Sequence, residues 1–202
     1  MAISKHADQR VGVFIDTQNF YHSAKHLYNN SRVNFAAILR DAVAGRKLVR
    51  ALAYVISTKE GVEHSFFEAL EKIGIETRSK ELQEFSSGVK KADWDVGLAI
   101  DAIALAPKLD AVVLCSGDGD FVPLVEFLQA RGVQVEVVAF GQSSALKLKE
   151  AADDFFDLSA DPETYLIGQS TGGHASKRVP RQRNDDAPTT KPARSPRRAI
   201  SL

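Results

Sequence analysis

Two patterns of apolar residues alternate along residues 10–159. Continuous apolar runs are typical of strands buried on both faces of a sheet, and apolar residues at helical spacing are typical of amphipathic helices. The run at 10–16 shows the first pattern, and Val62, Phe66 and Leu70 illustrate the second, before Gly74 ends the helix. The patterns predict strands at 10–16, 48–56, 75–82, 110–115, 133–139 and 155–158, and helices at 19–29, 34–44, 61–73, 93–106, 120–131 and 144–154.

This alternation predicts an α/β fold. Helices between consecutive strands imply a mostly parallel sheet with helices on both faces. In such sheets, ligands bind outside the carboxyl ends of the strands, where the strand order reverses. The glycine-rich fingerprints of dinucleotide and Walker-type sites are missing after the first strand, where the chain reads Asp16-Thr17-Gln18-Asn19. A polar loop is expected at 83–91.

Charge divides the chain into two parts, although the formal net charge is zero. Residues 168–202 carry a charge of +6 and four of the seven prolines, whereas residues 1–167 carry −6. The tail has few large apolar residues, so burial cannot offset its ordering entropy, and we expect it to be disordered. It is either a solvated extension or a weak electrostatic arm for nucleic acid. We therefore expect an N-terminal extension at 1–9, one domain at 10–167 and a basic, proline-rich tail at 168–202.

The single cysteine excludes a disulfide framework and a thiol-rich zinc site. Cys115 lies inside an apolar run, so a small buried hydrophobe in a reducing cytosol is expected. The first ten residues lack the apolar core of a signal peptide, and no stretch approaches the roughly 18 apolar residues of a membrane span. The sequence thus predicts a soluble, cytoplasmic protein without a membrane partner.

Three aspartates follow two of the predicted buried strands. Asp16 ends the run at 10–16, and Asp118 and Asp120 follow the run at 110–115. The carboxyl ends of neighbouring parallel strands meet at one edge of a sheet, where clustered carboxylates repel one another. A divalent cation that also holds a phosphate is a common solution. The positions therefore predict a metal-dependent phosphate site.

The segment Ser116-Gly117-Asp118-Gly119-Asp120-Phe121 is the most specific one in the chain. Pro123 is tolerated only in a first helical turn, so the helix should begin around 119–122 and both acids should lie on the bend before it. We expect the two glycines to give this bend unusual backbone angles. Helix capping explains one Asp but not two. A calcium loop of the EF-hand type would need two flanking helices, whereas a strand precedes this segment.

At the first strand, Asp16 could serve only as a turn or capping residue. Asn19 could bind a metal through water or cap the following helix. Phosphatases of the haloacid-dehalogenase type have a second acid two residues after the nucleophilic Asp, and Gln18 stands at that position. This alternative fold is therefore disfavoured.

A fourth acid is expected from the helix at 93–106. Asp95 shares a helical face with small residues, which would let the helix lie close to the sheet (Ala99, Ala102 and Ala106). Asp101 points about 120° away from Asp95, at 100° per residue, so a solvated or structural role is expected for it. Asp93 is a candidate for the N-cap only. Asp95 is therefore the preferred ligand.

Several further side chains are candidates for contacts with nucleic acid. Positive charges can position phosphates, although most surface lysines are simply solvated. Trp94 and Tyr21 could stack on bases or pack against the protein. His22, His26 and His64 show no spacing typical of a metal site or a catalytic triad. The candidate nucleic-acid contacts are Arg78, Lys80, Lys90, Lys91 and Ser116.

These segments together resemble the NYN domain family, and more narrowly its LabA-like branch within the PIN-like nuclease superfamily. The resemblance spans about residues 10–159 and rests on three segments: Ile15-Asp16-Thr17-Gln18-Asn19, the helix start from Lys90 to Asp101, and Ser116 to Phe121 followed by Leu124-Val125. It implies a three-layer α/β/α Rossmann-like sandwich. It also implies a metal-dependent ribonuclease site built from Asp16, Asp95, Asp118 and Asp120, with Asn19 near the rim.

Two positions depart from the family pattern. Thr17 stands where glycine is common, and a β-branched residue does not readily take a positive φ, so the first loop could be shaped differently. The acid of the helix is duplicated as Asp93 and Asp95, which leaves two candidates for one role.

The resulting functional prediction is an endoribonuclease that uses Mg²⁺ or Mn²⁺, as one or two ions. A metal-activated water would hydrolyse RNA phosphodiesters, with Asp16 and Asp118 as direct ligands and Asp95 and Asp120 completing the site. RNA, single-stranded or structured, is the expected partner, and a homodimer is left open. The alternatives are a non-catalytic RNA-binding or regulatory module and a metal-dependent phosphatase acting on a small substrate.

Overall fold

The computed structural model describes residues 5–57, 64–81, 83–84, 90–91 and 94–168. The side chains of residues 83–84 and 90–91 lie outside this description, as do the predicted tail beyond Gly168, Asp93 and the first residues of the predicted helix at 61–73. Among the described residues, no helix is long and apolar enough to cross a membrane.

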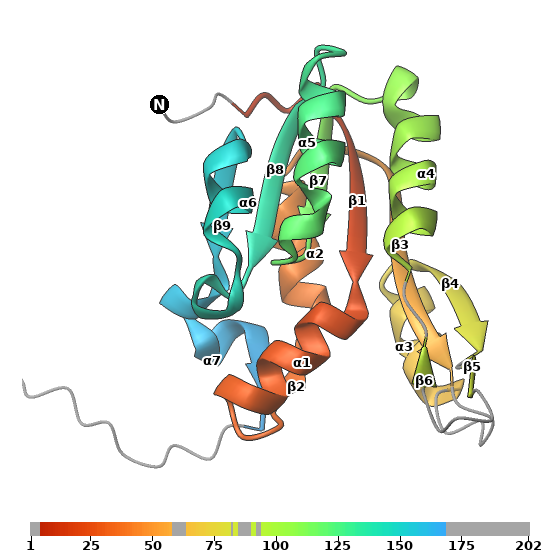
Figure 1. Ribbon diagram of the computed structural model, residues 1–202, viewed down its shortest axis with the longest axis vertical. Helices are drawn as coiled ribbons and strands as arrows, with labels where there is room; N and C mark the ends of the chain where they lie inside the picture. The colour runs from red at the N-terminus through yellow and green to blue at the C-terminus, as the bar shows by residue number, and fades with distance from the viewer. Residues whose placement is uncertain (1–4, 58–63, 82, 85–89, 92–93, 169–202) are drawn as a thin grey trace, which may run out of the picture. The chain divides into compact units, whose positions relative to one another are not determined.

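Strands and helices alternate through most of the described chain (Figure 1). The strands are β1 Arg10–Asp16, β2 Arg32–Val33, β3 Lys47–Ser57, β4 Glu76–Glu81, β5 Gln83–Glu84, β6 Lys90–Lys91, β7 Ala111–Cys115, β8 Gln134–Ala139, β9 Asp154–Asp157 and β10 Leu166–Ile167. The helices are α1 Thr17–Leu27, α2 Phe35–Val43, α3 His64–Lys72, α4 Asp95–Leu105, α5 Val122–Gln129, α6 Leu146–Ala151 and α7 Pro162–Tyr165. Short 3₁₀ turns are η1 Ala106–Lys108, η2 Gly119–Phe121, η3 Gly141–Ser143 and η4 Leu158–Ala160.

Within the described residues, six strands form one sheet in the order β4-β3-β1-β7-β8-β9, and every neighbouring pair is parallel. The chain first builds outward from β1 through β3 to β4, and then continues on the other side of β1 with β7, β8 and β9. The strand order therefore reverses between β1 and β7, which pair from Val11↔Ala111 to Ile15↔Cys115. Their carboxyl ends form the topological switch point, where α/β sheets bind ligands.

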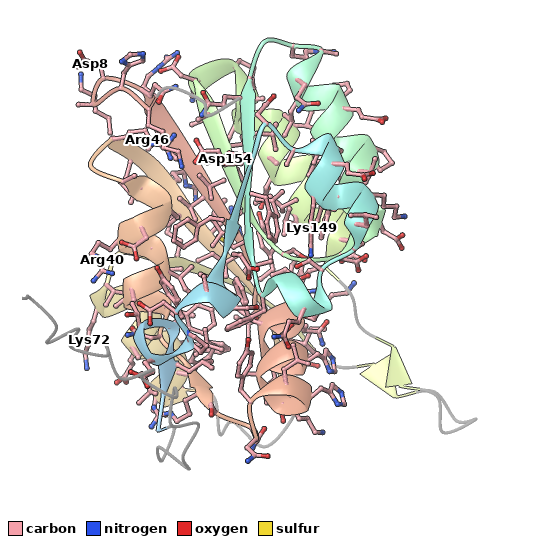
Figure 2. The ribbon with its side chains drawn as sticks, turned by 90° about the vertical axis from the view of Figure 1, so that its left-hand side faces the viewer. Asp8, Arg40, Arg46, Lys72, Lys149 and Asp154 are labelled. Atoms are coloured by element: carbon pink, nitrogen blue, oxygen red, sulfur yellow. The ribbon has the colours of Figure 1, made fainter. Side chains whose placement is uncertain are left out.

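Side chains alternate across the sheet and create two hydrophobic cores. On β1, Val11, Val13 and Ile15 face one core, together with residues of α1, α2, α3 and α7. Phe14 faces the other, together with residues of α4, α5 and α6. The two helical layers lie on either side of the sheet in Figure 2, where Arg40 of α2 and Lys149 of α6 mark opposite sides. This arrangement confirms the predicted three-layer α/β/α sandwich with a mostly parallel sheet.

The helix stop predicted at Gly74 is confirmed by the backbone, and two other helices end in the same way. Gly45, Gly74 and Gly132 follow α2, α3 and α5 and have φ angles of 74°, 84° and 79°. Such angles favour glycine because it has no Cβ atom.

Some local predictions were wrong. The loop at 83–91 contains the short antiparallel pair of β5 and β6, and β2 pairs with β10 in a second small antiparallel sheet. The helix expected at 120–131 begins with η2, and α1 begins at Thr17 rather than at residue 19. Two-residue strands are too short to show a period, which explains why the pattern did not reveal them.

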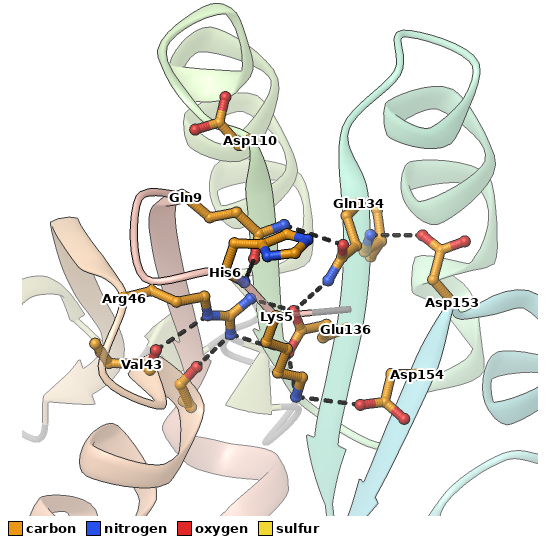
Figure 3. A network of polar contacts seen from close by, with 12 residues as sticks. Lys5, His6, Gln9, Val43, Arg46, Asp110, Gln134, Glu136, Asp153 and Asp154 are labelled. Carbon is orange, nitrogen blue, oxygen red and sulfur yellow. Dashed lines mark hydrogen bonds and ion pairs between the residues drawn. The ribbon is translucent and has the colours of Figure 1, made fainter. Parts of the chain in front are cut away.

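A polar network lies near the amino ends of the strands, at the edge opposite the switch point (Figure 3). Arg46 and Glu136 are buried, and Arg46 Nη2 donates to Glu136 Oε2 at 3.0 Å. Arg46 also donates to the carbonyl oxygens of Ala42 and Val43 at the end of α2. Lys5 Nζ lies 2.8 Å from Glu136 Oε2 and 3.1 Å from Asp154 Oδ2. Residues 5–9, assigned above to an N-terminal extension, thus contact the rest of the fold.

Candidate active site

Asp16 is the last residue of β1 and the N-cap of α1. Its Oδ1 accepts a hydrogen bond from the backbone N–H of Asn19 at 3.1 Å. Thr17 follows without a positive φ, and its hydroxyl donates to the carbonyl oxygen of Tyr54 at 2.6 Å. The local geometry therefore accommodates the β-branched residue at this position. The capping role considered for Asp16 is present, and it fixes the direction in which the carboxylate points.

Ser116 joins the ends of β1 and β7. Its hydroxyl donates to Asp16 Oδ2 at 3.0 Å and accepts from the backbone N–H of Asp118 at 3.1 Å. A second link comes from Asn19, whose Oδ1 accepts from the backbone N–H of Gly117 at 2.9 Å. Ser116 is fully buried, and its hydrogen bonds order the carboxylates. The predicted contact between Ser116 and nucleic acid is therefore not supported, because nucleic acid could not reach this hydroxyl.

Asp118 is the N-cap of η2, and its Oδ1 accepts from the backbone N–H of Asp120 at 2.9 Å. Pro123 lies in the first turn of α5, as its sequence position predicted. The bend between β7 and α5 therefore presents Asp118 at the switch point.

Gly117 and Gly119 serve a different purpose from the one expected. Neither has a positive φ. A Cβ atom on Gly117 would lie 3.0 Å from Ser144 Cα, and one on Gly119 would lie 2.9 Å from Ala145 Cβ. The glycines thus allow the loop to lie against the segment that leads into α6, and Ala145 N–H donates to the carbonyl oxygen of Gly117 at 2.9 Å.

Three acids, from the end of β1, the loop after β7 and the start of α4, come together at one small hollow. It has a volume of about 170 Å³ and is lined by Asp16, Gln18, Asn19, His22, Asp95 and Asp118. Sequence positions 16, 95 and 118 are thus brought to one edge of the sheet by the parallel topology.

Asp120 does not line this hollow. Its side chain is 80% exposed, and its Oδ1 lies 3.6 Å from Nζ of Lys147. The side chain points away because Asp120 belongs to the 3₁₀ turn after Asp118, not to the end of the strand. The sequence predicted that Asp120 would lie with the other three acids. The structure instead places Asp120 outside the hollow.

Asp95 is positioned through its neighbour Trp94, the N-cap residue of α4. The indole N–H of Trp94 donates to the carbonyl oxygen of Val55 at 2.9 Å, and its ring packs on Tyr54 with centroids 5.5 Å apart. A Cβ atom on Gly97 would lie 2.5 Å from the Trp94 ring, so glycine is needed for this packing. Trp94 thus anchors the start of α4 to the carboxyl end of β3, next to the hollow.

The remaining candidates have structural contacts or lie outside the description. Asp101 accepts from the Tyr54 hydroxyl at 2.9 Å and lies 3.5 Å from Arg78 Nε, which agrees with the structural role predicted for it. Lys80 Nζ lies 5.8 Å from the centroid of the Trp94 ring. Lys90 and Lys91 belong to β6, and their side chains are outside the described part of the structure.

Burial makes the negative charge of Asp16 unfavourable. Desolvation raises the pKa of its carboxyl group, and the nearby charge of Asp118 adds to this effect. Hydrogen bonds from Asn19 and Ser116 oppose the rise without cancelling it. A cation in the hollow would relieve the repulsion and favour the ionised form.

The donor set suits a hard divalent cation that keeps part of its water shell. Among the described residues, no three His, Cys, Asp or Glu side chains lie close enough to enclose a metal ion by themselves. Mg²⁺ is commonly held by one or two carboxylates and several waters, and an ionised carboxylate has lone pairs beyond those used here. Asp16 and Asp118 therefore fit such an ion, whereas a cage of four aspartates does not form.

His22 is the residue that sequence reasoning missed. It lies on α1, one turn after Gln18 and Asn19, and these three residues line the hollow together. The spacing of three and four residues on one helix was the available signal. Metal-site and triad spacings do not reveal His22, because it has neither.

Fold and site together define an α/β protein with carboxylates at the switch point of a parallel sheet. The chain belongs to the NYN domain family, whose model matches residues 10–159, and this family belongs to a nuclease superfamily. Over 159 residues the chain is 31% identical to the low amplitude and bright protein LabA of Synechococcus elongatus, covering 74% of this chain and 84% of LabA.

A solved structure shares the fold. A Vibrio parahaemolyticus protein of unknown function superimposes with a TM-score of 0.72 at 30% identity, covering 82% of this chain and all of that protein. The family resemblance stated from the sequence is therefore confirmed.

Proposed function

We propose that this protein is a cytoplasmic endoribonuclease that depends on Mg²⁺ or Mn²⁺. The observation that carries the proposal is the hollow at the switch point, where carboxylates from β1, the loop after β7 and α4 meet beside the polar groups of Asn19 and His22. Membership of a family within a nuclease superfamily supports the reaction class.

The chain's own residues would orient the substrate and the cation. Asp16 and Asp118 would hold the ion, and Ser116 and Asn19 keep these two acids in place through their hydrogen bonds. Asp95 would complete the site from α4. When bound, Mg²⁺ or Mn²⁺ would neutralise charge on the phosphate and lower the pKa of a water molecule.

The test compares Asp118→Asn with the matched control Asp120→Asn in the same loop. Metal ions contribute several kcal/mol to such transition states, so Asp118→Asn should lower RNA cleavage by about 100-fold or more. Asp120→Asn should retain most activity, because Asp120 lies outside the hollow. Labelled RNA with Mn²⁺, with Mg²⁺ and with chelator provides the assay. Equal activity of the two variants would contradict the assignment.

A second function is a non-catalytic RNA-binding module. The hydrogen bonds that Asp16 accepts from Asn19 and Ser116, and that Asp118 accepts from Asp120, give these carboxylates structural roles that need no metal, which favours this alternative. RNA binding by the wild-type protein without cleavage at millimolar Mn²⁺ would support it.

A further inference from the structure

A larger cavity lies next to the acidic hollow. Its volume is about 770 Å³, and it is lined by residues of α1, the turn before β2, β2, the start of α2, the end of β3 and α3. Gln18 and His22 line both spaces, so the cavity and the hollow meet at this pair of side chains. The cavity and the hollow thus adjoin at the start of α1, and we call the two adjoining spaces together the depression.

The chemical character of this depression changes along its length. The larger cavity has aromatic walls, with the rings of Phe35 and Phe66 5.7 Å apart between centroids. At its margin Tyr21 is 55% exposed, and Lys25 Nζ lies 6.0 Å from the centroid of the Tyr21 ring. Arg32 also lines the cavity and is exposed. The depression is thus aromatic at one end and carboxylate-lined at the other.

We infer that this cavity binds the base and ribose of one unpaired RNA nucleotide, whose phosphate lies at the acidic hollow. The inference rests on the proposed function. A nucleotide has the matching polarity, with a flat ring at one end and an anion at the other that a cation can link to carboxylates. Ligand cavities of about 300–1,000 Å³ enclose ligands of this size, and proteins recognise unpaired bases by stacking them on aromatic rings.

The exposed residues of the cavity are expected to make the decisive contacts. Tyr21 supplies a ring on which a base can stack, and Arg32 supplies a positive charge for the backbone. His22 is a positioning residue at the junction, with ring nitrogens available for hydrogen bonds to the ribose or phosphate. A base held in a duplex cannot enter such a cavity without leaving its partner, so the site should select unpaired RNA.

The experiment measures fluorescence anisotropy of a labelled single-stranded RNA hexanucleotide with the full-length protein in the presence of Ca²⁺, a hard cation with oxygen ligands, and gel electrophoresis of the same samples confirms that the RNA stays intact. Tyr21→Ala should weaken binding about fivefold or more, the lower end of what one base–aromatic stack provides. Tyr21→Phe keeps the ring and should bind like the wild type. His22→Ala should weaken binding, whereas His64→Ala should not, because His64 lies on α3 and does not line the cavity.

Two further arms identify the ligand. The same hexanucleotide annealed to its complement should bind weakly and show no dependence on Tyr21. Adenosine 5′-monophosphate should compete only at much higher concentration than the hexanucleotide, and equal potency would overturn the assignment to an RNA strand in favour of a free nucleotide.

The outcomes separate this inference from the nuclease proposal. If cleavage requires Asp118 while Tyr21→Ala and His22→Ala bind RNA like the wild type, the cavity assignment is overturned and the nuclease stands. If both variants lose RNA affinity while no cleavage occurs with Mn²⁺, the cavity assignment stands and the hydrolytic function fails. Tyr21 and His22 are exposed, so both variants should fold, and thermal unfolding checks this.

Discussion

Among individual residues, Asp16 shows most directly how burial acts on a carboxylate at the switch point. Burial raises the pKa of its carboxyl group, so the folded protein binds a proton more readily than the unfolded chain does. Stability must then decrease as the pH rises from the ordinary range of an Asp, near 3.8, through the higher pKa of the folded state. The loss of stability caused by the buried charge of Asp16 is complete above that pKa.

Asp16→Asn should therefore unfold at a higher temperature than the wild type at neutral pH without metal. Asn is as good an N-cap as Asp, so α1 keeps its cap, and the buried charge is removed. The difference should shrink as the pH falls below the ordinary range of Asp, and Mn²⁺ should stabilise the wild type more than the variant. Thermal unfolding followed by circular dichroism measures both. A variant less stable than the wild type at every pH would contradict this account.

Among the elements, α4 is held at its first turn by the packing of Trp94 against Gly97, which leaves no room for a side chain at position 97. The ring of Trp94 lies where the Cβ atom of any other residue at position 97 would have to be. Because Trp94 is next to Asp95, this packing also decides where that acid lies.

Gly97→Ala should displace the indole and destabilise the protein by about 1–3 kcal/mol, the usual cost of overpacking. The displaced ring would lose its hydrogen bond to the carbonyl oxygen of Val55. Denaturant unfolding measures the stability, and RNA cleavage measures the effect on Asp95. Ala99→Ser in the same helix is the control, because it leaves the Trp94 contact in place. A variant with wild-type stability would show that the Trp94 ring can move without any loss of stability.

The sequence predicted where the strands lie, but it did not predict some side-chain directions and close contacts. Buried runs such as 10–16 and 110–115 predicted strands, and parallel topology then predicted that Asp16 and Asp118 would meet. Asp120 could not be placed in the same way, because its direction depends on the 3₁₀ turn that follows Asp118. Likewise, the close approach of Gly117 to Ser144 joins segments that no local pattern relates.

For the molecule as a whole, the network around Glu136 joins the start of the described chain, the end of α2 and two strands. Burial alone would raise the pKa of Glu136, but hydrogen bonds and charge from Arg46 and Lys5 outweigh it and the pKa is lowered. The resulting stability is present above the ordinary pKa of a Glu and is lost as the pH falls through the lower pKa of the folded state.

Glu136→Gln should lower the free energy of unfolding by about 3–5 kcal/mol, because it leaves the buried guanidinium of Arg46 without its counter-charge. The double variant Arg46→Met with Glu136→Leu removes both charges and should be markedly more stable than the single variant. Urea unfolding at neutral pH provides the measurement. Equal losses in the two proteins would show that packing, and not the unpaired charge, dominates.

The basic tail also concerns the molecule as a whole, and its role remains a prediction from sequence alone. If it is an electrostatic arm, removing residues 168–202 should make RNA affinity less dependent on salt. The slope of log affinity against log salt should fall by about 0.7 for each contact with a phosphate of single-stranded RNA that is lost. Affinity measured from low to moderate ionic strength tests this. An unchanged slope would identify the tail as a solvated extension only.

The anchoring of Trp94 has a practical consequence. It is the sole tryptophan of the chain, so the intrinsic ultraviolet emission above that of tyrosine comes from one indole beside Asp95. Cation binding could then be followed on unlabelled protein through the fluorescence of Trp94, which lies beside the acidic hollow.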